Sequence, residues 1–169
     1  MPASISAELL SDCINHLQES TKRVETCLQV LTEEQVWHKP NESSNSIANL
    51  ILHLCGNMTQ YVLSSLGNQP DSRERDQEFS IKGGLNKKAL FEKLSSTVAA
   101  VILVLEKFTE KSLLQIKSVQ GFSKSGVGII VHVTEHFSYH TGQITLLTKL
   151  ITNKNLDFYK GYNLNTKNS

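Results

Sequence analysis

Six apolar residues between positions 90 and 108 recur at steps of three or four, which is the spacing of one face of an α-helix. They are Leu90, Leu94, Val98, Ile102, Leu105 and Phe108. Asn86 precedes them and can cap the helix, because its side-chain oxygen can accept a hydrogen bond from the first turn. A helix with such an apolar stripe must bury it against other elements, so the rest of the chain has to provide partners.

Two further segments show the same periodicity. One spans residues 10–31, and the other begins after the possible cap Ser46 and runs to about Leu66. Between them, Thr32 and Gln35 have the spacing of a capping box, which predicts a short extra turn of helix.

The segment 126–151 sets local propensity against length. Its stretch 129–134, rich in isoleucine and valine, is typical of a strand. A strand of about 25 residues would be far longer than strands in globular proteins, so we predict a helix. A helix places one set of residues on a common face: Ile129, His132, His136, His140, Leu147 and Leu150.

Polar connections separate these helices. Residues 68–84 are predicted to be a long connection rather than a packed element, and residues 109–125 allow a brief extended turn but not a sheet. Four long helices with two extended connections predict an all-α protein with a four-helix bundle. We expect one domain over residues 1–160 and a polar C-terminal tail over 161–169.

Composition excludes several partners. Seventeen Lys and Arg against sixteen Asp and Glu leave a formal charge of +1, which disfavours binding to nucleic acid or an anionic membrane. The odd number of cysteines favours reduced thiols, and the N-terminus lacks the pattern of a signal peptide. No stretch is apolar for long enough to span a membrane. We therefore expect a cytoplasmic protein.

Three histidines in the last predicted helix follow one another at intervals of four: His132, His136 and His140. Residues four apart on a helix lie roughly 6 Å apart, so two imidazoles can reach one metal ion at bonds of about 2.0–2.1 Å. The outer two are about 12 Å apart along the axis, so only one adjacent pair can bind the same ion. Both pairs remain open at this point, and both contain His136.

The first pair also matches the His-x-x-Glu-His pattern of inverted zinc peptidases, with Glu135 as the would-be base. Those enzymes need a further acidic ligand downstream. Asp157 is the only acid after Glu135, so the peptidase interpretation is disfavoured.

Two segments, 45–57 and 135–144, resemble the DinB-like superfamily. The branch most similar to this chain is the one known as domain of unknown function 1572, and the charged stretch 71–79 also resembles it. The resemblance implies a four-helix bundle in which His53, His136 and His140 bind one divalent metal ion. Neutral imidazoles suit zinc or nickel, which are the expected ions.

Three protein ligands leave open coordination positions, which is the arrangement of a catalytic metal site. Water or a thiol could be activated there, and some members of the superfamily are thiol-dependent transferases or isomerases. The resemblance therefore implies a hydrolase or a thiol-dependent transferase acting on an unknown small molecule, with a low-molecular-weight thiol as a possible cofactor, in a homodimer. The alternative is a non-catalytic bundle whose ion is structural or sensory. No residue is assigned as a catalytic acid or base.

Other residues are candidates for the surroundings of the site. Four could support the ligands or line a pocket: His132, Tyr139, Gln143 and Asn57. For Tyr139 and Gln143 the default expectation is a hydrogen bond to a ligand imidazole. Four charged residues could cover the mouth of the site or contact a second subunit: Arg73, Arg75, Asp76 and Glu78.

Overall fold

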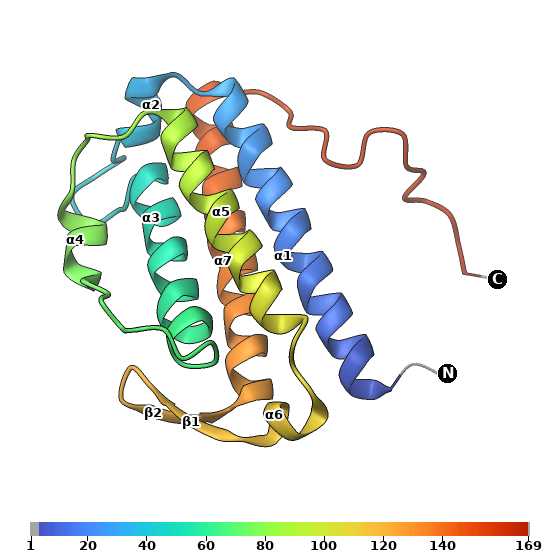
Figure 1. Ribbon diagram of the computed structural model, residues 1–169. Helices are drawn as coiled ribbons and strands as arrows, with labels where there is room; N and C mark the ends of the chain where they lie inside the picture. The colour runs from blue at the N-terminus through green and yellow to red at the C-terminus, as the bar shows by residue number, and fades with distance from the viewer. Residues whose placement is uncertain (1–3, 169) are drawn as a thin grey trace.

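The computed structural model describes residues 4–168, and within them four long helices pack side by side as a bundle (Figure 1). These helices are α1 (Ile5–Val30), α3 (Ile47–Met58), α5 (Lys87–Leu105) and α7 (Gly126–Thr152). The predicted all-α bundle is confirmed, and the segment with strand-like composition is the helix α7.

Side-chain caps define where the helices begin. Ser46 accepts a hydrogen bond from the backbone N–H of Asn49, and the Asn49 side chain closes the capping box on α3. The side chain of Asn86 accepts a hydrogen bond from the backbone N–H of Ala89 and so caps α5. The predicted capping box between Thr32 and Gln35 opens the short helix α2 (Glu33–Trp37).

The second long helix changes character before it ends. From Thr59 to Ser64 its hydrogen bonds follow the wider π-helical pattern, as element η1. The chain then turns at Gly67, where a Cβ atom would lie 2.6 Å from the carbonyl oxygen of Leu63. Only glycine fits so close to another backbone, and the next residue, Asn68, leaves the helix with a positive φ of 56°.

The polar connection 68–84 is not merely a linker, which corrects the expectation from its composition. It contains a short helix, α4 (Arg75–Ser80), that packs against α3. No residue of α4 is fully buried, so the segment has no apolar period that could have predicted it.

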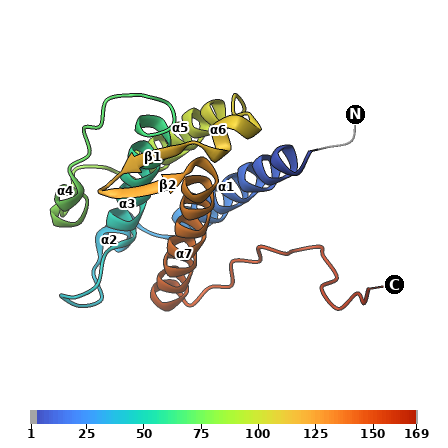
Figure 2. The same cartoon turned by 90° about the horizontal axis from the view of Figure 1, so that it is seen from below.

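The second connection is also more ordered than expected. It forms a short helix, α6 (Glu110–Leu114), and a two-stranded antiparallel sheet of β1 (Ile116–Val119) and β2 (Phe122–Ser125). Gln120 and Gly121 make the turn with positive φ angles of 51° and 79°, as a two-residue hairpin requires. Figure 2 shows this hairpin beside the N-terminal end of α7.

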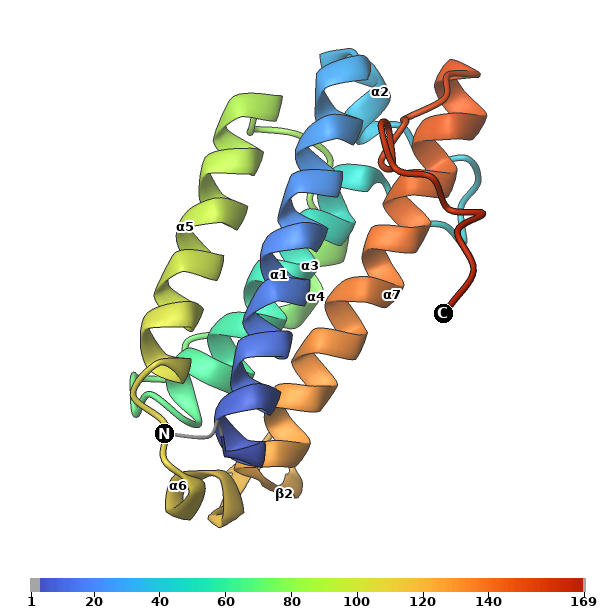
Figure 3. The ribbon, with the colours of Figure 1, turned by 90° about the vertical axis from the view of Figure 1, so that its right-hand side faces the viewer.

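Helix α3 lies at the centre of the packing. It contacts α2, α4, α5 and α7, and all of its residues except Gly56 are buried. Helix α7 packs most extensively against α1, as Figure 3 shows, and also contacts α3. Leu150 lies outside these interfaces and is 71% exposed, contrary to its predicted place on the inward face. Among the residues described, no helix is both long and apolar enough to cross a membrane.

Candidate metal centre

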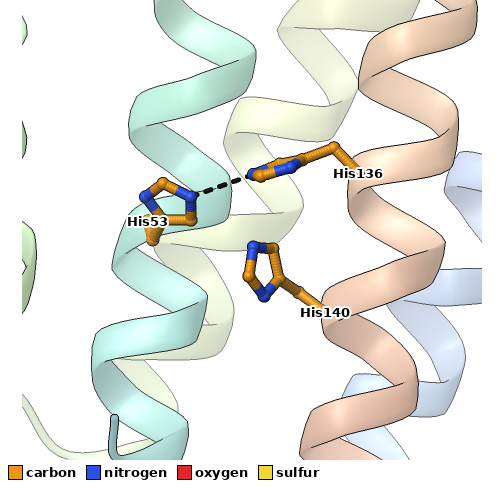
Figure 4. Close-up of side chains that lie close together, drawn as sticks. All are labelled: His53, His136 and His140. Atoms are coloured by element: carbon orange, nitrogen blue, oxygen red, sulfur yellow. Dashed lines mark hydrogen bonds between the residues drawn. The ribbon is translucent and has the colours of Figure 1, made fainter. Parts of the chain in front are cut away.

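Three histidines meet between α3 and α7. His53 comes from the middle of α3, whereas His136 and His140 come from successive turns of α7 (Figure 4). One ring nitrogen from each lies within 4.8 Å of the other two. The Nε2 atoms of His53 and His136 are only 2.9 Å apart. His53 and His140 are buried, and His136 is half-buried. The structure thus brings together the three residues that the resemblance implied.

These distances fit a metal ion. Two imidazole nitrogens bound tetrahedrally to zinc at about 2.0–2.1 Å would lie about 3.3 Å apart. The observed separations, from 2.9 Å to at most 4.8 Å, bracket that value. The three histidines could therefore hold one divalent ion.

In two of the candidate ligands, the ring nitrogen Nδ1 makes a hydrogen bond to a neighbouring side chain. Nδ1 of His53 lies 2.8 Å from Oε2 of Glu78, and Nδ1 of His140 lies 2.6 Å from Oε1 of Gln143. An amide oxygen only accepts hydrogen bonds, so His140 carries its proton on Nδ1. Its Nε2 lone pair is then free for an ion.

Glu78 is held in turn by Arg73. The Nε of Arg73 donates to Oε1 of Glu78 at 2.7 Å, and its Nη2 donates to Oε2 at 2.9 Å. The side chains are 3% and 10% exposed, respectively. Burial favours a raised pKa for Glu78, but the hydrogen bonds from Arg73 and His53 outweigh it and leave the pKa lowered. Glu78 is therefore a carboxylate.

The surroundings of His136 and His140 favour the uncharged form of both side chains. Burial, together with the neighbouring imidazoles and Arg73, lowers the pKa of His136 to about 3. Burial also lowers the pKa of His140. Because a metal ion binds only the neutral imidazole, both side chains are in the protonation state that binding requires at neutral pH.

Of the residues expected to support the ligands, some contact a candidate ligand and others do not. Gln143 bonds a candidate ligand, as its default expectation stated. Tyr139 does not: it is 63% exposed and lays its ring edge-on to His140, with centroids 5.1 Å apart. Among the residues described, no hydrogen bond joins its hydroxyl to an imidazole. Asn57 is buried one turn after His53, and its Oδ1 has no hydrogen-bond partner within residues 4–168.

His132 stacks between two rings rather than joining the cluster. Its centroid lies 4.5 Å from that of Tyr61 and 5.5 Å from that of His136. Burial and nearby Lys124 lower its pKa. The Tyr61 hydroxyl donates to Gln120 at the tip of the hairpin, which connects this side of the site to the end of the bundle.

The four charged residues of the connection divide into two pairs. Arg73 and Glu78 join the site directly. Arg75 and Asp76 are exposed, and Arg75 lies over the ring of Phe79 at 5.0 Å. Over the range 4–168, Asp76 forms no ion pair.

Two residues of the site were missed by the sequence analysis. Phe79 packs on the ring of His53, with centroids 4.7 Å apart. Asn49 donates from Nδ2 to the carbonyl oxygens of Glu78 and Ile81, both at 2.9 Å, and so ties α4 to α3. The available signal was a polar side chain every fourth residue, Asn49, His53 and Asn57, in an otherwise apolar helix.

Comparisons with known proteins agree with this fold. The model of a family described as "Protein of unknown function (DUF1572)" matches residues 4–160. A conserved protein from Enterococcus faecalis has a TM-score of 0.71 at 16% identity, over 85% of this chain and 97% of its own. No curated protein matches the chain.

Two DinB-like proteins of known structure are also similar. The one from Bacillus cereus has a TM-score of 0.66 at 18% identity, covering 82% of this chain and 90% of its own. The one from Bacillus subtilis has a TM-score of 0.65 at 17% identity, covering 90% and 96%. At such identities the likeness concerns the fold alone, and it confirms the DinB-like bundle.

Proposed function

The chain belongs to the DUF1572 family of proteins of unknown function, and we propose that it is a divalent-metal-dependent enzyme with an open three-histidine site. The observation that carries the proposal is the convergence of His53, His136 and His140, whose candidate ligand atoms lie within 4.8 Å of one another. Three ligands leave positions for other molecules, unlike the closed four-ligand arrangement of a structural zinc site.

A bound zinc or nickel ion would supply Lewis acidity that lowers the pKa of water or of a thiol. The protein contributes orientation: Gln143 fixes one imidazole, and the packing of α3 against α7 sets the distance between the two helices. The reaction classes that fit this chemistry are hydrolysis and thiol-dependent transfer on a small molecule. The homodimer and the cytoplasmic location expected from the sequence stay predictions.

A purely structural ion fits the molecule less well. The bundle already buries a continuous apolar core with residues from all four long helices. A domain of 169 residues with such a core folds without a metal staple. The histidines therefore do not have to bind an ion for the fold to form.

Elemental analysis of protein purified without an affinity tag is the direct test. We expect about one equivalent of zinc or nickel per chain, and its loss in the variants His53→Ala, His136→Ala and His140→Ala. Exposed His16 provides the matched control, because His16→Ala should retain the metal. A parent protein that binds no metal after supplementation would refute the proposal.

Catalysis is tested next on the metal-loaded protein. Panels of ester and amide substrates report hydrolysis, and electrophiles offered with low-molecular-weight thiols report transfer. We expect turnover in one panel that disappears on chelation and returns with the metal. Metal binding without turnover in either panel would favour the alternative, a non-catalytic bundle in which the ion is sensory.

A further inference from the structure

The carboxylate of Glu78 is positioned by contacts from three separate parts of the chain. Arg73 grips it with two hydrogen bonds of 2.7 and 2.9 Å. Asn49 bonds the main-chain carbonyl oxygen of Glu78 itself. Gly56 provides the space, because a Cβ atom at that position would lie 1.8 Å from Oε1 of Glu78. The place of this carboxylate is therefore fixed on several sides.

Arg73 is also held from behind. Its Nη1 donates to Oε1 of Gln60 at 3.0 Å, and the Nε2 of Gln60 donates to Asp71 at 2.9 Å. A chain of contacts thus runs from the surface to His53 through one guanidinium group and one carboxylate. Its two buried charged members, Arg73 and Glu78, are paired with each other, as buried charges must be.

Stability alone does not account for this arrangement. Removing a carboxylate and a guanidinium group from water costs several kcal/mol per ion, and well-packed apolar residues are often at least as stabilising. Arg73 and Glu78 lie among the least exposed charged side chains of the site, at 3% and 10%. Their geometry instead directs one oxygen, Oε2 of Glu78, at Nδ1 of His53.

The contact determines which nitrogen of His53 carries the proton. A carboxylate oxygen can only accept, so Nδ1 of His53 must donate across the 2.8 Å contact. The Nη2 of Arg73 lies 3.2 Å from the same nitrogen, but it donates to Oε2, which thus accepts from both groups. In the neutral ring the Nε2 atom of His53 then keeps its lone pair, and it lies 2.9 Å from Nε2 of His136.

We propose that Glu78, held by Arg73, is a positioning residue that fixes His53 in the Nδ1–H tautomer and so raises the affinity of its Nε2 for the metal ion. Carboxylates behind metal-binding histidines act in this way by fixing the ring and making it more basic. The inference rests on the proposed function, since it assigns a second role within the same site. Glu78 itself does not contact the ion.

The test compares Glu78→Gln with the parent protein and with Asp76→Asn, which removes an exposed carboxylate from the same short helix. Zinc affinity is measured by competition with a chromophoric chelator. We expect affinity to fall about 10- to 100-fold in Glu78→Gln and to stay unchanged in Asp76→Asn. Arg73→Lys keeps the charge but loses the two-point grip, and we expect a smaller fall in the same direction.

A second readout separates positioning from mere stabilisation. Nitrogen-15 NMR of the metal-free protein reports the tautomer of each histidine. We expect His53 to be protonated on Nδ1 in the parent and in Asp76→Asn, and to lose this preference in Glu78→Ala, which leaves no carboxylate beside Nδ1. Glu78→Gln is not used for this readout, because its amide oxygen can still accept from Nδ1. A general loosening of the fold would change all the histidines rather than His53 alone.

The outcomes distinguish the two proposals. Unchanged zinc affinity in Glu78→Gln, together with an unchanged His53 tautomer in Glu78→Ala, would overturn the role of Glu78 and leave the metal site standing. A parent protein without zinc affinity would overturn the proposed function, while the tautomer measurement would still test the Glu78 contact. If Glu78→Gln does not fold, equal zinc affinity in Arg73→Lys and the parent would overturn the inference.

Discussion

Helix α7 packs against two of the other long helices, α1 and α3, and the two interfaces differ in chemistry. Against α1, its most extensive contact, the buried residues of the partner are mostly apolar, and a 4.0 Å contact joins Cys27 Sγ to Thr145 Oγ1. Against α3, the same helix places two imidazoles beside a third. One face of α7 therefore stabilises the bundle, whereas the other presents groups that can bind a ligand.

The two interfaces are stabilised by different interactions. The α1 interface is stabilised by apolar surface removed from water, which tolerates small adjustments of the side chains. The α3 interface depends on hydrogen bonds of defined direction, because each buried ring nitrogen needs a partner. Changes on the two sides should therefore affect different properties, one the free energy of unfolding and the other metal affinity.

The largest effect is expected from Leu17→Ala on the buried face of α1. Leu17 is 1% exposed, and its truncation leaves a cavity in the core. We expect the free energy of unfolding to fall by about 2–5 kcal/mol, with zinc affinity of the folded protein unchanged. Urea denaturation and chelator competition measure the two quantities. Leu103→Ala, at a position that is 58% exposed, is the control and should cost less than about 0.5 kcal/mol.

His136→Ala should lower zinc affinity strongly and the free energy of unfolding only slightly, the opposite of Leu17→Ala. We expect zinc affinity to fall by more than about 100-fold, because one of three candidate ligands is removed. The free energy of unfolding of the metal-free protein should change by less than about 1.5 kcal/mol, since this side chain is only half-buried. If the variant unfolds when it loses the metal, the conclusion that the two faces of α7 affect different properties would be wrong.

Ser46→Ala tests a residue that serves both properties. Ser46 caps α3 and donates to Oδ1 of Asn49 at 2.7 Å, and Asn49 holds α4 over the site. Loss of the cap should lower the free energy of unfolding by about 0.5–2 kcal/mol, and zinc affinity should fall slightly. Ser96→Ala on the exposed side of α5 is the matched substitution and should alter neither quantity measurably.

The smallest effect concerns the thiols. Burial raises the pKa of Cys55, on α3, to about 11 and also raises the pKa of Cys27, on α1. At pH 8 only about one Cys55 in a thousand is then a thiolate, the form that reacts. We expect neither residue to be alkylated by iodoacetamide in the folded protein, whereas both should react in guanidinium chloride. Mass spectrometry resolves the sites. Rapid labelling of Cys27 alone would show that the contact between α1 and α7 opens locally, whereas labelling of Cys55 alone would show opening beside Thr97 of α5.

The long helices were predictable because their signals are local. Apolar periodicity together with caps such as Ser46 and Asn86 defined where α3 and α5 begin, since a cap is satisfied by residues only three positions away. The choice of helix over strand for 126–151 required the length of the segment as well as its composition. Leu150 was misplaced because it repeats the angular position of His132 after 18 residues, at the outer edge of the face.

The short elements were not predictable from periodicity. No residue of helix α4 is fully buried. Hydrogen bonds of Asn49, Arg73 and Glu78 hold the helix against α3, and these residues approach one another only in the folded chain. The hairpin 116–125 has strands of four residues, too short for an alternating pattern to stand out.

The candidate site was predictable only in part for the same reason. Spacing alone allowed His136 to pair with either neighbour, and the resemblance was needed to add His53 from another helix. The roles of Glu78 and Phe79 depend on how α4 lies over α3, which no spacing within the segment could reveal.

The polar attachment of α4 has a thermodynamic consequence. Because none of its residues is fully buried, releasing the helix would expose little apolar surface. The heat capacity of unfolding and the denaturant dependence of stability scale with the surface exposed, so both would be almost the same with α4 attached or released. Calorimetry of the whole domain would therefore scarcely register a movement that takes Glu78 away from His53, while amide hydrogen exchange within residues 75–80 would report it directly.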